Sequence, residues 1–160
     1  MLDADASLRQ HLLTLLDGTT ARLSFEAATA NVPPALRGVR PEGLPFSLWE
    51  LLEHYRLAQS DLLEVCRDPH HTSPADDSGY WPTEREPANE EAWERSLAGC
   101  HLDLQAMKAL VANPETDLHA PIPWTGFKTV LRQVLVVADH NAYHLGQMVA
   151  VRRMLGVWPG

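Results

Sequence analysis

Apolar residues recur every three or four positions in four long segments of the chain, and this spacing constrains the fold more than any other feature of the sequence. An α-helix has about 3.6 residues per turn, so the spacing gathers the apolar side chains on one face of each segment. No stretch of useful length alternates apolar and polar residues as a half-buried strand would. The expected helices cover roughly residues 5–17, 47–66, 89–112 and 128–155.

Local signals place the ends of these helices. Ser47 and Glu50, in the stretch "SLWE", have the spacing of a capping box, which begins a helix. Gly18 and Gly156 follow the first and the last helix, where a glycine can adopt the left-handed conformation that ends a helix. Between the first two helices, residues 19–46 are broken by prolines and glycines and are expected to hold only short helical turns.

The connection between the second and third helices, residues 67–88, contains four prolines and has no hydrophobic period. A connection of this length is usually functional or disordered, and it is long enough to cross a helical bundle and let both helices run in the same direction. Its aromatic residues Tyr80 and Trp81 could line a pocket, although an anchoring role against the bundle is favoured. Four amphipathic helices with two long crossings predict an all-α four-helix bundle, in one domain over residues 1–160.

The charge balance excludes several classes of function. The formal net charge is −8, whereas a nucleic-acid binder or a protein that docks on an anionic membrane needs clustered lysine and arginine. No apolar run approaches the length of a bilayer span, and the acidic start "MLDADASLRQ" lacks the features of a signal peptide, so a cytoplasmic protein is expected. Cys66 and Cys100 stand far apart, which indicates neither a disulfide framework nor a CxxC site.

Two histidines lie four residues apart in "DHNAYHLGQ", on the otherwise apolar last helix. Because a helix turns 100° per residue, His140 and His144 differ by only about 40° and can reach one point beside the helix. This is the geometry of two ligands to a single metal ion. His54, beside the apolar face of the second helix, is the best candidate for a third ligand, and three neutral imidazoles would leave one coordination position open.

The remaining histidines are poorer candidates for the third ligand. Two lie in the long second connection, one lies in the last irregular connection, and two stand alone on helices: His70, His71, His119, His11 and His101. A hydrogen-bonding role stays open for the pair on the last helix, since two buried imidazoles need polar partners even without a metal.

Helical angles also place the polar neighbours of the histidine pair. Gln133 and Gln147 fall close to the centre of its face, and Tyr143 falls at its rim. Asn141 and Asp139 flank the first histidine of the pair and could orient a ligand imidazole or contact a neighbouring helix. The second role is expected for Asp139, because it points away from the ligand face.

Polar residues of the second helix have a structural interpretation beside the functional one. Glu50 and Asp61 fall on the same side as His54. The capping box explains Glu50 better than catalysis does, and Asp61 is most simply solvated or paired. Cys66 lies about 120° around the helix from His54, so it is expected in the core and not as a nucleophile.

Several stretches together resemble one known family. "ADHNAYHLGQMVAVRRMLGVWP" looks like the last helix of the DinB-like (YfiT-like) metalloenzymes, a family of small, DNA-damage-inducible helical proteins. "FSLWELLEHYRLAQSDLLE" is similar to the second helix of that family, and "RGVRPEGLPFSLWELLEH", "GYWP" and "LGVWP" extend the similarity over most of the chain. The combination is specific, although each piece alone is not.

The resemblance implies a fold and a metal site. The fold is an up-down-down-up four-helix bundle. The metal is a divalent ion, often nickel or zinc, bound by three histidines that correspond to His54, His140 and His144 in this sequence. Some relatives in the wider superfamily use low-molecular-weight thiols such as bacillithiol or mycothiol.

Three functions are compatible with such a site. An ion held by neutral ligands lowers the pKa of a bound water or thiol, so thiol transfer to an electrophile and hydrolysis are both open, with thiol transfer narrowly favoured. The third is a stress-related metal-binding domain without catalysis, since no residue is an obvious general base. The expected partner is a small molecule, and apolar faces left over from a small bundle, together with relatives that pair through helices, predict a homodimer.

Overall fold

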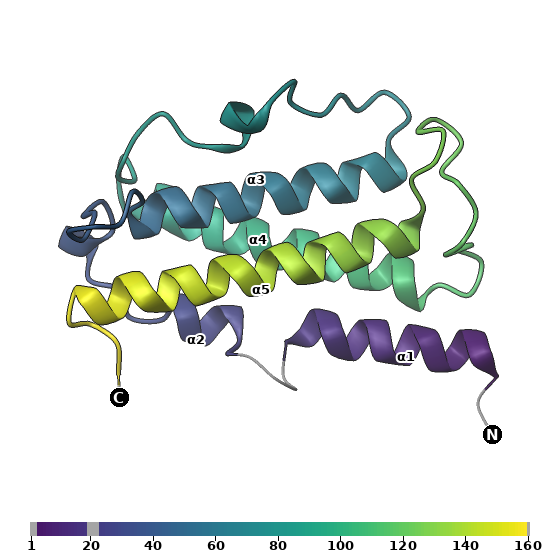
Figure 1. Cartoon of the computed structure of the whole chain (residues 1–160), viewed down its shortest axis with the longest axis horizontal. Helices are drawn as coiled ribbons and strands as arrows, with labels where there is room; N and C mark the ends of the chain where they lie inside the picture. Colours follow the sequence, from purple (N-terminus) through teal and green to yellow (C-terminus); the bar gives the residue numbers. More distant parts are fainter. Residues whose placement is uncertain (1–2, 19–22, 160) are drawn as a thin grey trace.

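The computed structural model describes residues 3–18 and 23–159, and this part of the chain is helical (Figure 1). Two short 3₁₀ turns, η1 and η2, cover Pro34–Leu36 and Asp77–Tyr80. The described ranges contain no strand, only a single bridge between Pro121 and Thr129. The predicted all-α class is therefore confirmed. The α-helices are α1 Ala4–Asp17, α2 Phe25–Thr29, α3 Leu48–Arg67, α4 Glu90–Ala112 and α5 Val130–Met154.

The four long helices pack against one another in pairs. Helix α3 packs against both α4 and α5, and α1 packs against the same two helices from the other side. Figure 1 shows α3 and α4 running in one direction and α1 and α5 in the other. Residues 68–89 return along the outside of α3, so that α4 can begin beside the start of α3. This long connection lets α3 and α4 run in the same direction, and its 3₁₀ turn η2 packs against α3.

The helix ends follow the local signals in the sequence. The Ser47 hydroxyl accepts from the Glu50 backbone N–H at 3.2 Å, and the Glu50 carboxylate accepts from the Ser47 backbone N–H at 2.8 Å, which completes the capping box. Gly18 and Gly156 have φ angles of 68° and 72°, in the left-handed region that glycine tolerates. The short turns expected in residues 19–46 are α2 and η1, while residues 19–22 lie outside the described residues.

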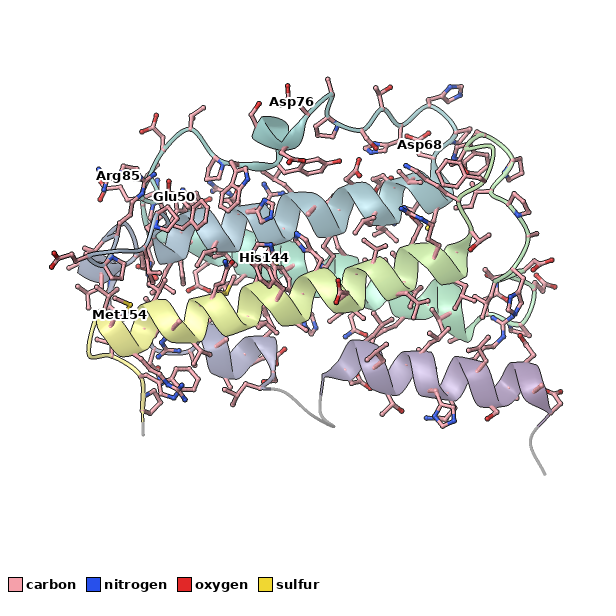
Figure 2. The ribbon with its side chains drawn as sticks, viewed as in Figure 1. Glu50, Asp68, Asp76, Arg85, His144 and Met154 are labelled. Atoms are coloured by element: carbon pink, nitrogen blue, oxygen red, sulfur yellow. The ribbon has the colours of Figure 1, made fainter. Side chains whose placement is uncertain are left out.

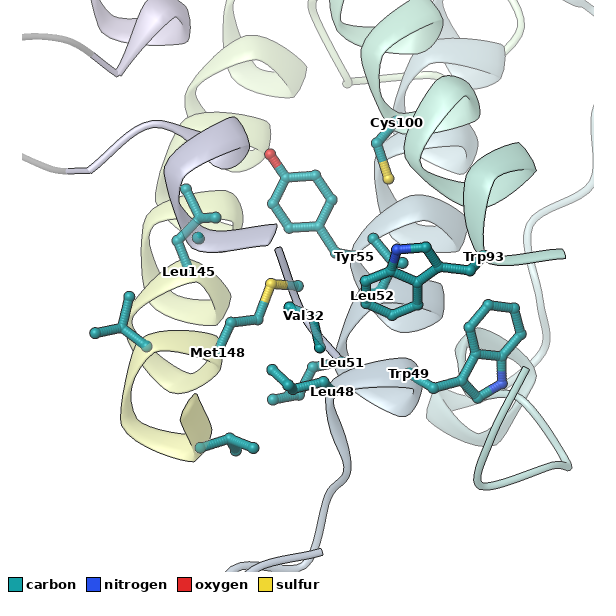
Figure 3. Packing of buried hydrophobic residues seen from close by; sticks show 13 residues of the cluster. Val32, Leu48, Trp49, Leu51, Leu52, Tyr55, Trp93, Cys100, Leu145 and Met148 are labelled. Atoms are coloured by element: carbon teal, nitrogen blue, oxygen red, sulfur yellow. The ribbon is translucent and has the colours of Figure 1, made fainter. Parts of the chain in front are cut away.

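The buried apolar side chains form two clusters along the bundle. One contains Leu52, Tyr55, Trp93 and Met148 and lies near the start of α3 (Figure 3). The other lies towards the end of α3 and the start of α5, and it includes Leu63, Met107, Val134 and Val137. Within the described ranges, no helix combines the length and the apolar character that a bilayer crossing demands.

Polar side chains occupy the middle of the bundle, between these clusters. Gln59 is fully buried; its amide nitrogen donates to the Cys100 carbonyl at 2.7 Å, and its amide oxygen accepts from Asn141 at 2.8 Å. These bonds join α3 to α4 and to α5 at the level where the histidines lie. A buried amide without such partners would cost about 1–3 kcal/mol, so the layer fixes the register of the three helices.

Candidate metal centre

Three imidazoles from two helices converge beside this polar layer. His54 comes from the middle of α3, and His140 and His144 come from adjacent turns of α5. The Nε2 atom of His54 lies 3.0 Å from Nε2 of His144 and 3.1 Å from Nε2 of His140. Figure 2 shows His144 between α5 and α3. The structure thus brings together the three histidines that the sequence singled out, and each offers a ligand atom within 4.8 Å of the others.

Hydrogen bonds at the far side of two rings fix which nitrogen carries the hydrogen. Nδ1 of His54 lies 3.1 Å from the backbone carbonyl of Tyr80. Nδ1 of His144 lies 2.7 Å from the amide oxygen of Gln147, whose amide nitrogen donates to the Tyr143 hydroxyl at 3.2 Å. Both partners of Nδ1 are oxygens that only accept, so Nδ1 carries the hydrogen in each ring. Each Nε2 atom therefore presents a lone pair to the centre.

The distances between these Nε2 atoms are suitable for a cation bound between them. Two neutral acceptor nitrogens repel at 3.0 Å unless a positive charge lies between them. A zinc ion binds imidazole nitrogen at roughly 2.0–2.1 Å, and in a tetrahedral site its ligand nitrogens lie ~3.3 Å apart. The observed separations of 3.0 and 3.1 Å approach that value. The three residues can therefore hold one metal ion.

A proton is a weaker explanation for this arrangement than a metal ion. Burial, together with the neighbouring rings of His140 and His54, lowers the pKa of His144 to about 4. The pKa values of His54 and His140 are also lowered, chiefly by burial. All three rings are consequently neutral near pH 7, which is the form that binds a metal.

The long connection closes one side of the site. The Trp81 ring stacks on His54, with centroids 3.9 Å apart and planes at 8°, and Phe46 stacks on the other face of Trp81 at 4.2 Å. The Tyr80 hydroxyl donates to Asp61 at 3.0 Å. The two aromatics thus anchor the connection to α3, as favoured from the sequence, and they also form a wall of the site.

A cavity of about 570 Å³ opens beside the three histidines. Its lining includes apolar side chains, the aromatic rings of Tyr80, Trp81 and Tyr143, and carboxylates from three elements. A molecule in this cavity can reach the point on which the imidazoles converge. The site therefore has the open side that a catalytic metal centre requires and a closed structural site lacks.

The polar neighbours of His140 and His144 on α5 differ in what they contact. Gln147 contacts the His144 imidazole and Tyr143 lines the cavity, as their helical angles predicted. The Gln133 amide oxygen instead accepts from Arg132 on the same helix at 2.7 Å. Asn141 reaches a neighbouring helix, whereas Asp139 is exposed and lines the cavity, which the sequence did not indicate.

Three residues have the structural roles that the sequence favoured. Glu50 closes the capping box and pairs with Arg40. Both carboxylate oxygens of Asp61 are bonded, one by Tyr80 and the other by His71 Nε2 at 2.7 Å. Burial raises the pKa of the Cys66 thiol to about 11, so this thiol is a poor nucleophile.

The protein is thus a small helical protein with a candidate metal centre, formed by three imidazoles from two helices. Comparison with protein-family models adds the family: the model of the DinB superfamily matches residues 7–148. The chain belongs to the DinB superfamily, and the resemblance noted in the sequence is confirmed. A search of curated proteins and a search of solved structures each gave no match.

Proposed function

We propose that this protein is a metal-dependent enzyme in which His54, His140 and His144 bind one divalent ion, zinc or nickel. The observation that carries the proposal is the convergence of three Nε2 atoms, with that of His54 at 3.0 and 3.1 Å from the other two. The Nδ1 hydrogens of His54 and His144 are bonded to oxygens outside this centre. We also propose that α1, α3, α4 and α5 form the up-down-down-up bundle of the family, which the helix directions in Figure 1 support.

The favoured reaction is transfer of a small thiol to an electrophile. When bound, a divalent ion with neutral ligands supplies a Lewis acid with an open position, which lowers the pKa of a thiol or water there. In the net reaction a sulfur–carbon bond forms and the bond from that carbon to its leaving group breaks. The thiol proton passes to solvent, and the leaving group departs with its bonding electron pair.

The residues of the chain have separate tasks in this proposal. The Tyr80 carbonyl and the Gln147 amide hold two imidazoles with Nε2 towards the ion. Trp81 covers one face of His54 and keeps water from it. The cavity beside them holds the thiol and the electrophile.

Thiol transfer is preferred over hydrolysis because it depends less on a base in the cavity. Hydrolysis calls for a group that takes a proton from water, and Asp61 is the buried carboxylate of the cavity wall. Both of its oxygens already accept hydrogen bonds, from His71 and from Tyr80. A thiol bound to a divalent ion is deprotonated outright, whereas a bound water keeps a pKa of about 7, so thiol transfer depends less on a base.

Metal binding is the first test. Untagged protein is stripped with a chelator, titrated with zinc, nickel or cobalt, and analysed for metal content. One ion per chain is expected, with loss of binding in His144→Ala and unchanged binding in His101→Ala, a matched change on the exposed surface of α4. Equal binding by both variants would contradict the proposed ligand set.

Turnover is the second test. The metal-loaded protein is assayed with a panel of small thiols and a halogenated electrophile, and in parallel with a panel of esters. Thiol-dependent release of halide is expected, and it should disappear on chelation and in His144→Ala. Metal binding without turnover in either panel would instead support a non-catalytic metal-binding domain.

A further inference from the structure

The charged side chains that line the cavity are all acidic. Asp61 comes from α3, Asp77 from η2 and Asp139 from α5, so three elements each contribute one carboxylate. In the part of the chain that the structure describes, no lysine or arginine lines the cavity. The cavity therefore carries a negative potential next to a centre whose three protein ligands are neutral.

The outer two carboxylates are available to a ligand. Asp77 and Asp139 are exposed, and neither forms an ion pair with a lysine or arginine among the described residues. Asp61 differs, because it is buried and its two oxygens are bonded by His71 and Tyr80. A positively charged group of a ligand could thus bind Asp77 and Asp139 without breaking an existing ion pair within the protein.

The other walls suit the stem of a small organic cation. Ala58, Leu62 and Val136 provide apolar surface, and Tyr143 presents an aromatic ring that is 64% exposed. Aromatic faces attract cations as well as apolar groups. At the inner end, His144 is only 6% exposed, and its Nε2 atom lies 3.0 Å from Nε2 of His54 at the point where the three imidazoles converge. The cavity therefore has an inner end for a metal-seeking atom and an outer end for a positive charge.

We propose that this cavity selects a small thiol that carries an amine, with its ammonium group towards Asp77 and Asp139 and its sulfur towards the three histidines, and that it disfavours thiols that carry a carboxylate. Attraction between unlike charges and repulsion between like charges give this order. The inference rests on the proposed function, because it places the sulfur at the proposed metal ion.

Three thiols with a similar two-carbon stem test the charge preference. Cysteamine is positive, 2-mercaptoethanol is neutral and 3-mercaptopropionate is negative. Each is titrated into the cobalt-loaded protein, and binding is followed by the sulfur-to-cobalt charge-transfer absorption. The same titrations are made with Asp77→Asn/Asp139→Asn and with Glu84→Gln/Glu94→Gln, which removes two exposed acidic charges outside the cavity.

The decisive quantity is the ratio of cysteamine affinity to 3-mercaptopropionate affinity. The intrinsic preference of cobalt for each thiol is the same in every variant, so a change in the ratio measures the effect of the two carboxylates on thiol binding. The ratio is expected to fall about tenfold in Asp77→Asn/Asp139→Asn, to stay unchanged in Glu84→Gln/Glu94→Gln, and to fall in the unmodified protein as salt is raised.

Two kinds of failure can be told apart. An unchanged ratio in Asp77→Asn/Asp139→Asn, with cobalt bound, would overturn the charge preference and leave the metal site intact. No absorption with any of the three thiols would also overturn it, because no sulfur would then reach the ion through this cavity. Failure to bind cobalt at all would instead overturn the proposed function.

Discussion

The Nε2 atoms of His54 and His144 lie 3.0 Å apart, although neither nitrogen carries a hydrogen to share. Each ring uses its Nδ1 hydrogen on an oxygen outside the site, the Tyr80 carbonyl for His54 and the Gln147 amide for His144. The rings are thus oriented before any ion arrives. Hydrogen bonds of this kind raise the affinity of a site for metal, because the imidazoles are already oriented when the ion binds.

Removing one outer partner should weaken metal binding without removing a ligand. Gln147→Met loses the hydrogen bond to His144 Nδ1, and the affinity for zinc is expected to fall about 10–100-fold. Competition with a chromophoric chelator measures the change. Gln105→Met on the exposed surface of α4 is the matched control. Equal zinc affinity in Gln147→Met and the unmodified protein would show that this bond does not orient the ligand.

The ring stack over His54 should contribute to stability. Trp81→Ala removes contacts with His54 and Phe46, and the free energy of unfolding is expected to fall by about 2 kcal/mol. Trp81→Phe keeps an aromatic ring and should restore most of the loss. Urea denaturation of the three proteins checks this, and equal losses in both variants would argue against the stack.

The buried amides at the centre of the bundle should act as a pair. Gln59→Leu removes the acceptor of the Asn141 amide nitrogen and the side-chain donor to the Cys100 carbonyl, at a cost of about 2 kcal/mol in the free energy of unfolding. Gln59→Leu/Asn141→Leu removes both amides and is expected to cost less than the sum of the single changes. Additive losses in this double-mutant cycle would mean that the two side chains do not interact.

The Glu50 carboxylate should make stability depend on pH. Burial raises its pKa, but hydrogen bonds from Arg40 and Ser47 outweigh burial and leave the pKa below its usual value. In the unfolded chain the group titrates near ~4.3. Its contribution is therefore fully present above that pH and is lost as the pH falls through the lower, folded-state pKa.

Glu50→Gln isolates this contribution. The difference in the free energy of unfolding between the unmodified protein and the variant should be positive at pH 7 and shrink towards zero as the pH is lowered below ~4.3. The exposed Glu42→Gln serves as the control. A difference that stays constant with pH would contradict the assignment of a stabilising charge to Glu50.

We propose that the protein forms a homodimer, as its leftover apolar surface led us to expect. Phe127, just before α5, and Leu135, in the second turn of α5, are 71% and 47% exposed. Light scattering should give twice the mass of one chain, and Leu135→Lys should give a single chain, whereas Leu102→Lys on α4 should not. A monomeric mass for the unmodified protein would refute the proposal.

Local sequence signals were sufficient where the structure itself is local. The spacing of His140 and His144 places both on one helix face whatever surrounds the helix, and Ser47 and Glu50 begin α3 through bonds within four residues. The position of His54 beside an apolar face indicated that it points into the bundle. The pairing of α3 with α5 was then enough to bring the three rings together.

The segment of residues 68–89 could not be placed in the same way, because it has no hydrophobic period. The stack of Trp81 on His54, and the role of Asp77 in the cavity wall, depend on the path of this segment over α3. Asp139 was misjudged for a related reason. Its angle away from the histidine face indicated a contact with a neighbouring helix, but the side chain is exposed and lines a cavity that the segment over α3 helps to form.

X-ray absorption at the zinc edge of the zinc-loaded protein tests the central claim most directly. The spectrum should show three imidazole nitrogens at ~2.0–2.1 Å from zinc, and His144→Ala should lose one of them or fail to retain the metal. A first shell without imidazole, or the same three nitrogens in His144→Ala, would contradict a shared ion between His54, His140 and His144.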